Sequence, residues 1–144
     1  MGHQIVLIIW SRHFGNVDVR LLMLLRLNRQ LKNFIMTLVV ELPDDIERRC
    51  GDQQLRWFPY LRKLTASSNP KITSEGTKHL NHLHTLKASC NPRITDEGIK
   101  HMQLHTLNAG GTSGITNEGI KHMQLHTLDA SYNPNITNEG IKHM

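Results

Sequence analysis

Histidine is the residue type with the clearest chemical potential in this sequence. The 144-residue chain contains ten histidines but only two cysteines, Cys50 and Cys90. Neutral imidazole binds transition metals and exchanges protons near neutral pH, so a histidine cluster can indicate a metal site or an acid–base catalyst. Seven of the histidines form two columns with a regular sequence spacing: His79, His101, His122 and His143, and His84, His105 and His126.

The residues around these columns favour neither a metal centre nor a catalytic site. A structural zinc site is a closed tetrahedral set with cysteine or carboxylate support, and Cys90 stands alone. A catalytic triad needs an oriented base and an oxyanion donor, and no motif marks either. We therefore predict a non-enzymatic protein with no cofactor and no metal, with histidines copied to the surface by a repeat. The sequence leaves open whether the columns bind metal.

The positive charge is concentrated outside the C-terminal half of the chain. The net charge is +5, but residues 65–144 contain seven Lys/Arg and six Asp/Glu. Such a balance offers no basic stripe for phosphates, so we predict no nucleic-acid partner. The apolar run Ile5–Trp10 is too short for a signal peptide or a membrane span. With so few cysteines, we expect an intracellular protein, cytoplasmic and without a membrane partner.

The columns follow from four copies of one unit. They cover residues 65–80, 87–102, 108–123 and 129–144, and GIKHMQLHTL occurs identically at 98–107 and 119–128. Ile72, Ile94, Ile115 and Ile136 mark the period, with spacings of 22, 21 and 21 residues. A fixed period of this size indicates stacked units, each unable to bury its apolar face alone.

The unit resembles the leucine-rich repeat. Its second copy has Leu83, Leu86, Ala88, Asn91 and Ile94 where that family has LxxLxLxxNxL, with alanine in the third leucine place and one extra residue before the isoleucine. The resemblance implies an α/β solenoid with short parallel strands on its concave face, short helices on its convex face and a helical N-terminal cap. We expect a cap with a capping strand at 1–42, a degenerate repeat or connector at 43–60, and four repeats at 61–144, the last truncated.

The repeat pattern predicts the local structure of each copy. Strands are expected near 62–66, 84–88, 105–109 and 126–130, because alternate apolar residues suit a half-buried strand. Asp96, Asn117 and Asn138 suit helix N-caps, and a glycine in each helix would allow close helix approach. In the third copy, Thr112 stands in the asparagine place.

The N-terminal third carries a different pattern. Residues 5–35 resemble an F-box: DVRLLMLLRLNRQLKNFI is similar to that family's Asp-leucine helix and the segment that follows. The resemblance implies a substrate receptor that docks a ubiquitin-ligase adaptor, although the front of the motif departs from the family. The alternative is an apolar helix pair that only caps the solenoid. Short chains of this kind also resemble proteins of giant viruses of amoebae, which would place this one in the host cytoplasm.

A solenoid of this type usually binds another protein on its concave face. We therefore predict a non-catalytic protein–protein interaction module, with the F-box-type receptor as the alternative function. The strand positions that face outward are the candidate contacts: Lys63, Thr65, Thr85, Lys87, Thr106, Asn108, Thr127 and Asp129, with Tyr132 nearby. Ile141 and Met144 are expected to form an open apolar edge through which two chains could pair as a homodimer.

Overall fold

The computed structural model describes residues 39–42 and 48–144. These residues belong to the second of two compact units, Val39–Met144. The expected F-box-like helices at 5–35, and most of the expected cap, lie outside the described residues.

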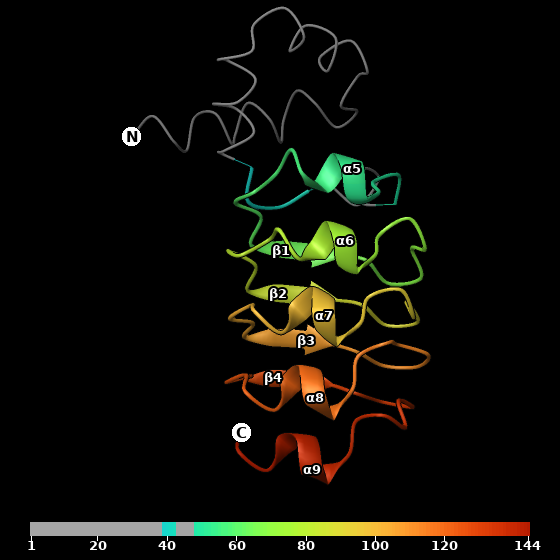
Figure 1. Cartoon of the computed structure of the whole chain (residues 1–144), viewed down its shortest axis with the longest axis vertical. Coiled ribbons are helices and arrows are strands. Elements are labelled where there is room, and N and C mark those ends of the chain that lie inside the picture. The colour runs from blue at the N-terminus through green and yellow to red at the C-terminus, as the bar shows by residue number, and fades with distance from the viewer. Residues whose placement is uncertain (1–38, 43–47) are drawn as a thin grey trace, which may run out of the picture. The chain divides into compact units, whose positions relative to one another are not determined.

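Four three-residue strands form one parallel sheet in the order β1-β2-β3-β4 (Figure 1). They are β1 (Lys63–Thr65), β2 (Thr85–Lys87), β3 (Thr106–Asn108) and β4 (Thr127–Asp129). Each lies inside its predicted range, so the strand prediction is confirmed. The central leucines explain the placement, because Leu64, Leu86 and Leu107 are fully buried while the residues on either side point out of the core.

One-turn helices alternate with the strands along the stack (Figure 1). They are α5 (Asp52–Leu55), α6 (Ser74–Thr77), α7 (Asp96–Ile99), α8 (Asn117–Ile120) and α9 (Asn138–Ile141). Apolar residues three positions apart face the core: Ile99 and Met102 are 0% and 3% exposed, and Ile120 and Met123 are 0% and 7% exposed. The described part is therefore an α/β array of parallel strands and short helices, compatible with a repeat solenoid.

The helix N-caps lie one residue earlier than predicted. Thr73, Thr95, Thr116 and Thr137 occupy the N-cap positions, and three of their hydroxyls accept a hydrogen bond from the backbone N–H of the following glutamate. The threonine is at the right distance for this bond. Asp96, Asn117 and Asn138 are instead the first helical residues, which frees their side chains for another role.

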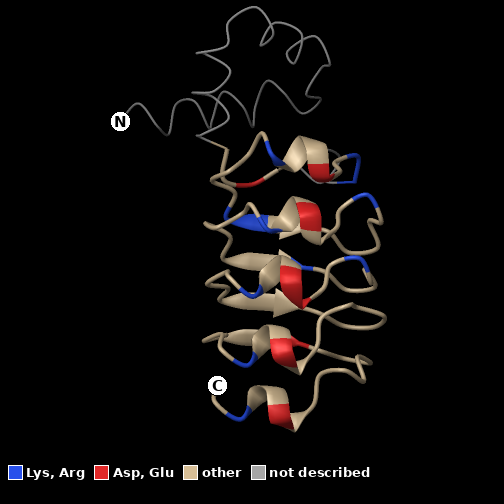
Figure 2. Ribbon diagram, viewed as in Figure 1, with Lys and Arg blue, Asp and Glu red and all other residues tan. Residues whose placement is uncertain are grey.

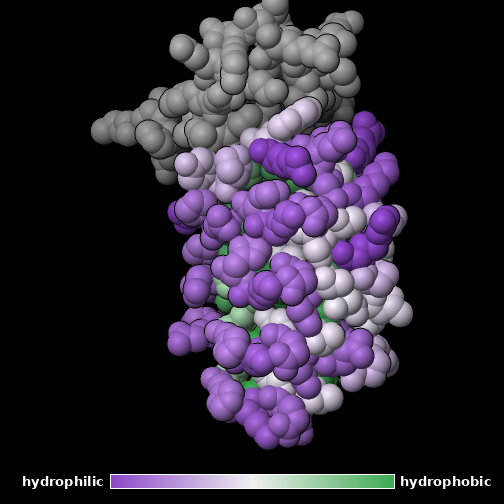
Figure 3. Space-filling view, in the orientation of Figure 1, coloured by the Kyte–Doolittle hydropathy of each residue, from purple (hydrophilic) through white to green (hydrophobic). Residues whose placement is uncertain are grey.

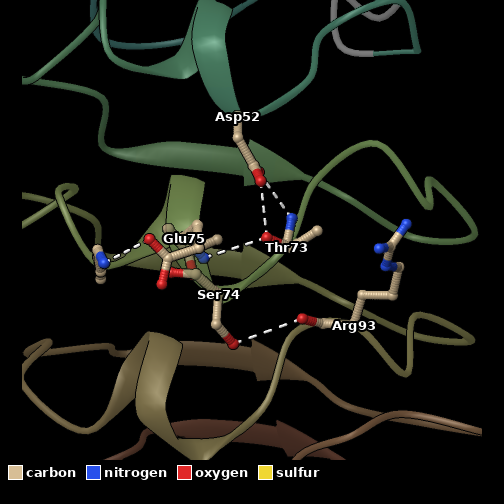
Figure 4. A network of polar contacts seen from close by, with 7 residues as sticks. Asp52, Thr73, Ser74, Glu75 and Arg93 are labelled. Atoms are coloured by element: carbon tan, nitrogen blue, oxygen red, sulfur yellow. Dashed lines mark hydrogen bonds and ion pairs between the residues drawn. The ribbon is translucent and has the colours of Figure 1, made fainter.

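That role is to connect successive repeats. The Thr73 N–H and hydroxyl donate to the two carboxylate oxygens of Asp52 at 2.7 and 2.6 Å (Figure 4). Asp96 accepts from Thr116 in the same way at 2.8 and 2.7 Å. Asn117 accepts from the Thr137 N–H at 2.8 Å and donates to its hydroxyl at 2.9 Å. Asp52, Asp96 and Asn117 thus each fix the N-cap of the next unit.

The helix glycines make room for these bonds. A Cβ on Gly119 would lie 2.3 Å from Asp96 Oδ1, and one on Gly140 would lie 2.4 Å from Asn117 Oδ1. Both distances are far below contact, so a side chain there would push the linking group away. The predicted close helix approach is confirmed, and its reason is the inter-repeat bond.

Buried asparagines stabilise the turns after the strands. The Asn91 amide donates to the carbonyls of Ala66, Asn69 and Ile72 at 2.9, 2.9 and 3.2 Å, and its oxygen accepts from the Arg93 N–H at 3.1 Å. The Ala66 and Asn69 carbonyls also accept backbone N–H groups within the turn, so the amide adds a second bond to each and supplies a partner for the Ile72 carbonyl. The predicted asparagine ladder is present at Asn69, Asn91 and Asn133, which are all buried.

The turn of the third copy differs from the prediction. Thr112 is exposed, and the neighbouring Ser113 is buried instead, its hydroxyl accepting from the Ile115 N–H at 3.4 Å. Gly114 approaches the preceding turn so closely that a Cβ would lie 2.5 Å from the Pro92 carbonyl oxygen. Its N–H donates to the Asn91 carbonyl at 3.4 Å. A glycine and a small hydroxyl therefore replace the proline and the asparagine.

Residues 39–61 contain elements of a further repeat. Glu41 forms a parallel bridge to Lys63, so the described end of the expected capping strand pairs with β1 at one position. Helix α5 lies in the place equivalent to α6, and Leu55, Phe58 and Leu61 are buried as the degenerate pattern predicted. Trp57, in the same segment, is 38% exposed.

Candidate binding surface on the sheet

The sheet face consists of eight outward side chains in two rows across β1–β4. Parallel register aligns Lys63, Thr85, Thr106 and Thr127 in one row. The second row is Thr65, Lys87, Asn108 and Asp129. The structure therefore brings together the eight strand residues that the sequence analysis singled out. All eight are exposed or half-buried.

The second row holds a polar cluster at its β3–β4 end. The Asn108 amide donates to Asp129 Oδ2 at 2.8 Å, and Asp129 Oδ1 accepts from the Ser131 N–H at 3.0 Å. Hydrogen bonds from the Ser131 hydroxyl and N–H, and then from Asn108, lower the pKa of Asp129. The carboxylate is thus held ionised at one place on the sheet face.

Positive charge lies toward the other end of the two rows. Lys63 forms an ion pair with Glu41, and both side chains are about half exposed. Lys87 is exposed on β2. The sheet face therefore has a lysine on β2 and an aspartate on β4, separated by the neutral Asn108.

Tyr132 stands beside this face in an unfavourable backbone conformation. It is 95% exposed and has a φ of 60°, in the left-handed region. Ser68 and Cys90 hold the equivalent place in their copies with φ of 54° and 53°, and Gly111 holds it in the third. A bulky residue rarely adopts this conformation. The turn imposes it in every copy, and in the fourth copy it presents an aromatic ring to solvent.

The two cysteines differ in their surroundings. Cys50 is buried, as expected for a small core residue, and Cys90 is exposed.

The histidine columns lie on different parts of each repeat. His84, His105 and His126 precede the strands, and their rings follow one another at centroid distances of 5.0 and 5.1 Å. Tyr60 stacks on His82 at 5.0 Å. Burial lowers the pKa of His101, and the charges of His79 and Lys100 lower it further, against a hydrogen bond to the Lys78 carbonyl. Within the described ranges, no three His, Cys, Asp or Glu side chains converge as a metal site.

The helices carry a regular column of ion pairs. Each pairs a glutamate with the lysine three residues later: Glu75–Lys78, Glu97–Lys100, Glu118–Lys121 and Glu139–Lys142 (Figure 2). The Lys78 partner also lowers the pKa of Glu75. In the view of Figure 3 the described residues present a mainly hydrophilic surface, with small apolar patches among the polar side chains. Exposed ion pairs of this kind contribute little stability. Because each combines one negative and one positive side chain, they leave the charge on this side balanced.

The last repeat leaves apolar side chains accessible. Ile141 is 39% exposed and Met144 is 45% exposed, whereas the equivalent Ile120 and Met123 are buried. The structure therefore places the two predicted edge residues at an accessible end of the described stack.

Comparison with known proteins gives no independent identification. No family model matches the chain, and no curated protein matches it. Among the residues that the structure describes, there is also no helix with the length and apolar character needed to cross a membrane.

Proposed function

We propose that residues 61–144 are leucine-rich repeats and that the chain is a non-catalytic protein-binding module. The observation that carries this proposal is the register of β1–β4, which sets eight side chains in two straight rows on one face. Main-chain hydrogen bonds and buried leucines hold the rows in place, so a partner would meet a preorganised surface. Threonines make up half of the two rows, so much of the surface is small and polar.

The charges and the tyrosine give this surface its specificity. Lys87 and Asp129 would select a partner with an acidic and a basic group at matching places. Tyr132 supplies the aromatic anchor that binding hot spots commonly contain. Its left-handed backbone is strained, and strain of this kind is found disproportionately at functional sites.

Affinity capture with matched variants tests this proposal. The immobilised chain is incubated with lysate, and bound proteins are identified by mass spectrometry. Lys87→Glu and Tyr132→Gly should remove the same partner, while Lys100→Glu on the helix side should retain it. A partner that survives both sheet-face changes but is lost with Lys100→Glu would move the binding surface to the helices.

The alternative function is that of an F-box-type substrate receptor. It rests on the DVRLLMLLRLNRQLKNFI segment within residues 5–35. A direct pull-down with purified ubiquitin-ligase adaptor tests it, with Leu24→Asp as the variant expected to lose the interaction. Failure of the unaltered chain to retain the adaptor would leave residues 5–35 as a cap only. Binding through the sheet face would be unaffected by that result.

We also propose that the accessible end formed by Ile141 and Met144 lets two copies pair as a homodimer. Light scattering at micromolar concentration tests this, and Ile141→Lys should convert a dimer to a monomer. A monomer mass for the unaltered chain would exclude the pairing.

A further inference from the structure

The histidines that precede the strands form a continuous row of metal-binding groups. His105 donates its backbone N–H to the His84 carbonyl at 2.8 Å, and His126 donates to the His105 carbonyl at 2.8 Å. This ladder fixes neighbouring backbones at the spacing of adjacent strands, about 4.8 Å. The rings lie at centroid distances of 5.0 and 5.1 Å, with interplanar angles of 38° and 27°. All three residues are exposed.

Two neighbouring rings of this row can share one ion at their nitrogen-bearing edges, because a metal ion binds an imidazole nitrogen in the plane of the ring. Each metal–nitrogen bond is about 2.0–2.1 Å, so two imidazole nitrogens on one ion lie at most about 4 Å apart. Rotation about the bonds of these exposed side chains would bring one nitrogen of each ring to a common ion. Water completes the coordination, because the described residues bring no third protein ligand to this place.

We propose that the row binds a divalent transition-metal ion through two adjacent imidazoles, with His105 a ligand in either pairing. Imidazole ligands suit Cu²⁺, Ni²⁺ and Zn²⁺, and the general order of affinities puts Cu²⁺ first. The site is independent of the sheet-face partner proposed above.

The neighbouring charges favour one of the two pairings. Arg62 holds the equivalent place in the row beside His84, and its carbonyl accepts the His84 N–H at 2.9 Å. A cation between His84 and His105 would therefore lie nearer the permanently charged Arg62 than one between His105 and His126, and like charges repel. The His105–His126 pair is thus the preferred site.

The second histidine column provides the internal control. It comprises His79, His101, His122 and His143. Within the described part of the chain, histidine rings contact each other only in the row of His84, His105 and His126. His101→Asn removes an imidazole without touching that row.

Calorimetric titration with Cu²⁺ tests the proposal, and electron paramagnetic resonance reports the number of nitrogen ligands. All proteins carry His3→Asn, which removes a histidine outside the described residues as a competing copper ligand. We expect one ion with two imidazole ligands. His105→Asn should weaken binding by about tenfold or more, since it separates both pairs. His126→Asn should weaken binding more than His84→Asn, and His101→Asn should leave it unchanged.

Several outcomes would overturn the site. Unchanged affinity in His105→Asn would do so, as would an equal loss in His101→Asn. Circular dichroism and metal-free melting of each variant show whether it has folded. If His105→Asn does not fold, the His84→Asn/His126→Asn double variant replaces it. That variant leaves one imidazole in the row and should lose affinity to the same extent, and unchanged affinity in it would equally overturn the site.

Discussion

Asp96 accepts two hydrogen bonds from Thr116, a residue in the next repeat, at 2.8 Å from its backbone N–H and 2.7 Å from its hydroxyl. Thr116 is the N-cap of α8, and its hydroxyl accepts from the Glu118 N–H at 3.2 Å. The carboxylate of one helix therefore orients the cap of the next helix. Equivalent bonds at Asp52–Thr73 and Asn117–Thr137 make this the recurring connection on the helix side of the stack.

Replacing the linking carboxylate should destabilise the array. Asp96→Ala removes both acceptors and leaves the Thr116 N–H without its partner. We expect a loss of about 1–3 kcal/mol in the free energy of unfolding, because both bonds are part-buried and are made to a charged acceptor. Urea denaturation followed by circular dichroism measures it.

A conservative variant provides the control for that change. Asp96→Asn should lose much less, because Asn117 already makes the same pair of contacts with Thr137. Equal free energies of unfolding for Asp96→Ala and Asp96→Asn would contradict the prediction. They would show that the hydrogen bonds between this side chain and Thr116 contribute nothing to stability.

The glycine three residues after each N-cap should resist substitution. Alanine at position 119 improves helix propensity by about 1 kcal/mol, yet its Cβ would lie 2.3 Å from Asp96 Oδ1. We expect Gly119→Ala to be destabilising overall by about 1–3 kcal/mol, since overpacking outweighs propensity. A double-mutant cycle measured by urea denaturation with Asp96→Ala tests the cause. The loss of stability caused by Gly119→Ala should be smaller in the Asp96→Ala background. If the effects of the two substitutions simply add, the loss does not come from a clash with the Asp96 carboxylate.

The sequence predicts the repeat's strands better than its connections. Leu64, Leu86 and Leu107 indicate their strands because one buried leucine and its flanking residues suffice to place a half-buried segment. The sequence pattern predicts the N-cap one residue too late. The N-cap is a threonine in all four copies, at Thr73, Thr95, Thr116 and Thr137, while the next residue varies. This invariant threonine is the feature of the sequence that indicates the N-cap. The role of the variable residue depends on a partner 20 or 21 residues away, which local propensity does not reveal.

The third turn shows a second limit of pattern alignment. Counting from Ile115 puts Thr112 in the asparagine place, but the structure buries Ser113. Gly114 lets this turn approach Pro92 and Ile94 more closely than a residue with a side chain could, which shifts the buried position by one. On the sheet face, strand periodicity identified all eight outward residues. The hydrogen bond between Asn108 and Asp129 required the register of β3 and β4.

Substitution at the left-handed turn position should lower stability in the third copy and raise it in the fourth. Gly111 has a φ of 64°, and a Cβ there would lie 2.7 Å from Cys90 Sγ. Gly111→Ala should therefore lower stability by about 1–2 kcal/mol. Tyr132→Gly should raise it by up to about 1 kcal/mol, because the exposed ring loses little packing while the backbone strain is relieved. Thermal and urea unfolding of both variants measure the two effects. Destabilisation by Tyr132→Gly would show that the ring makes a stabilising contact.

Acid should weaken the fold through His101. Burial, His79 and Lys100 lower the pKa of His101 in the folded chain below the usual histidine value. The folded state therefore binds this proton less readily than the unfolded state, so the contribution to stability is present above the ordinary pKa near 6.5 and is lost as pH falls through and below it. His101→Gln removes the titrating group and should reduce the fall in the urea midpoint between pH 7.5 and pH 5. Lys100→Gln should raise the pKa of His101 in an NMR titration, but only part of the way, because burial is the larger cause. An unchanged pH dependence in His101→Gln would assign the acid sensitivity to other groups.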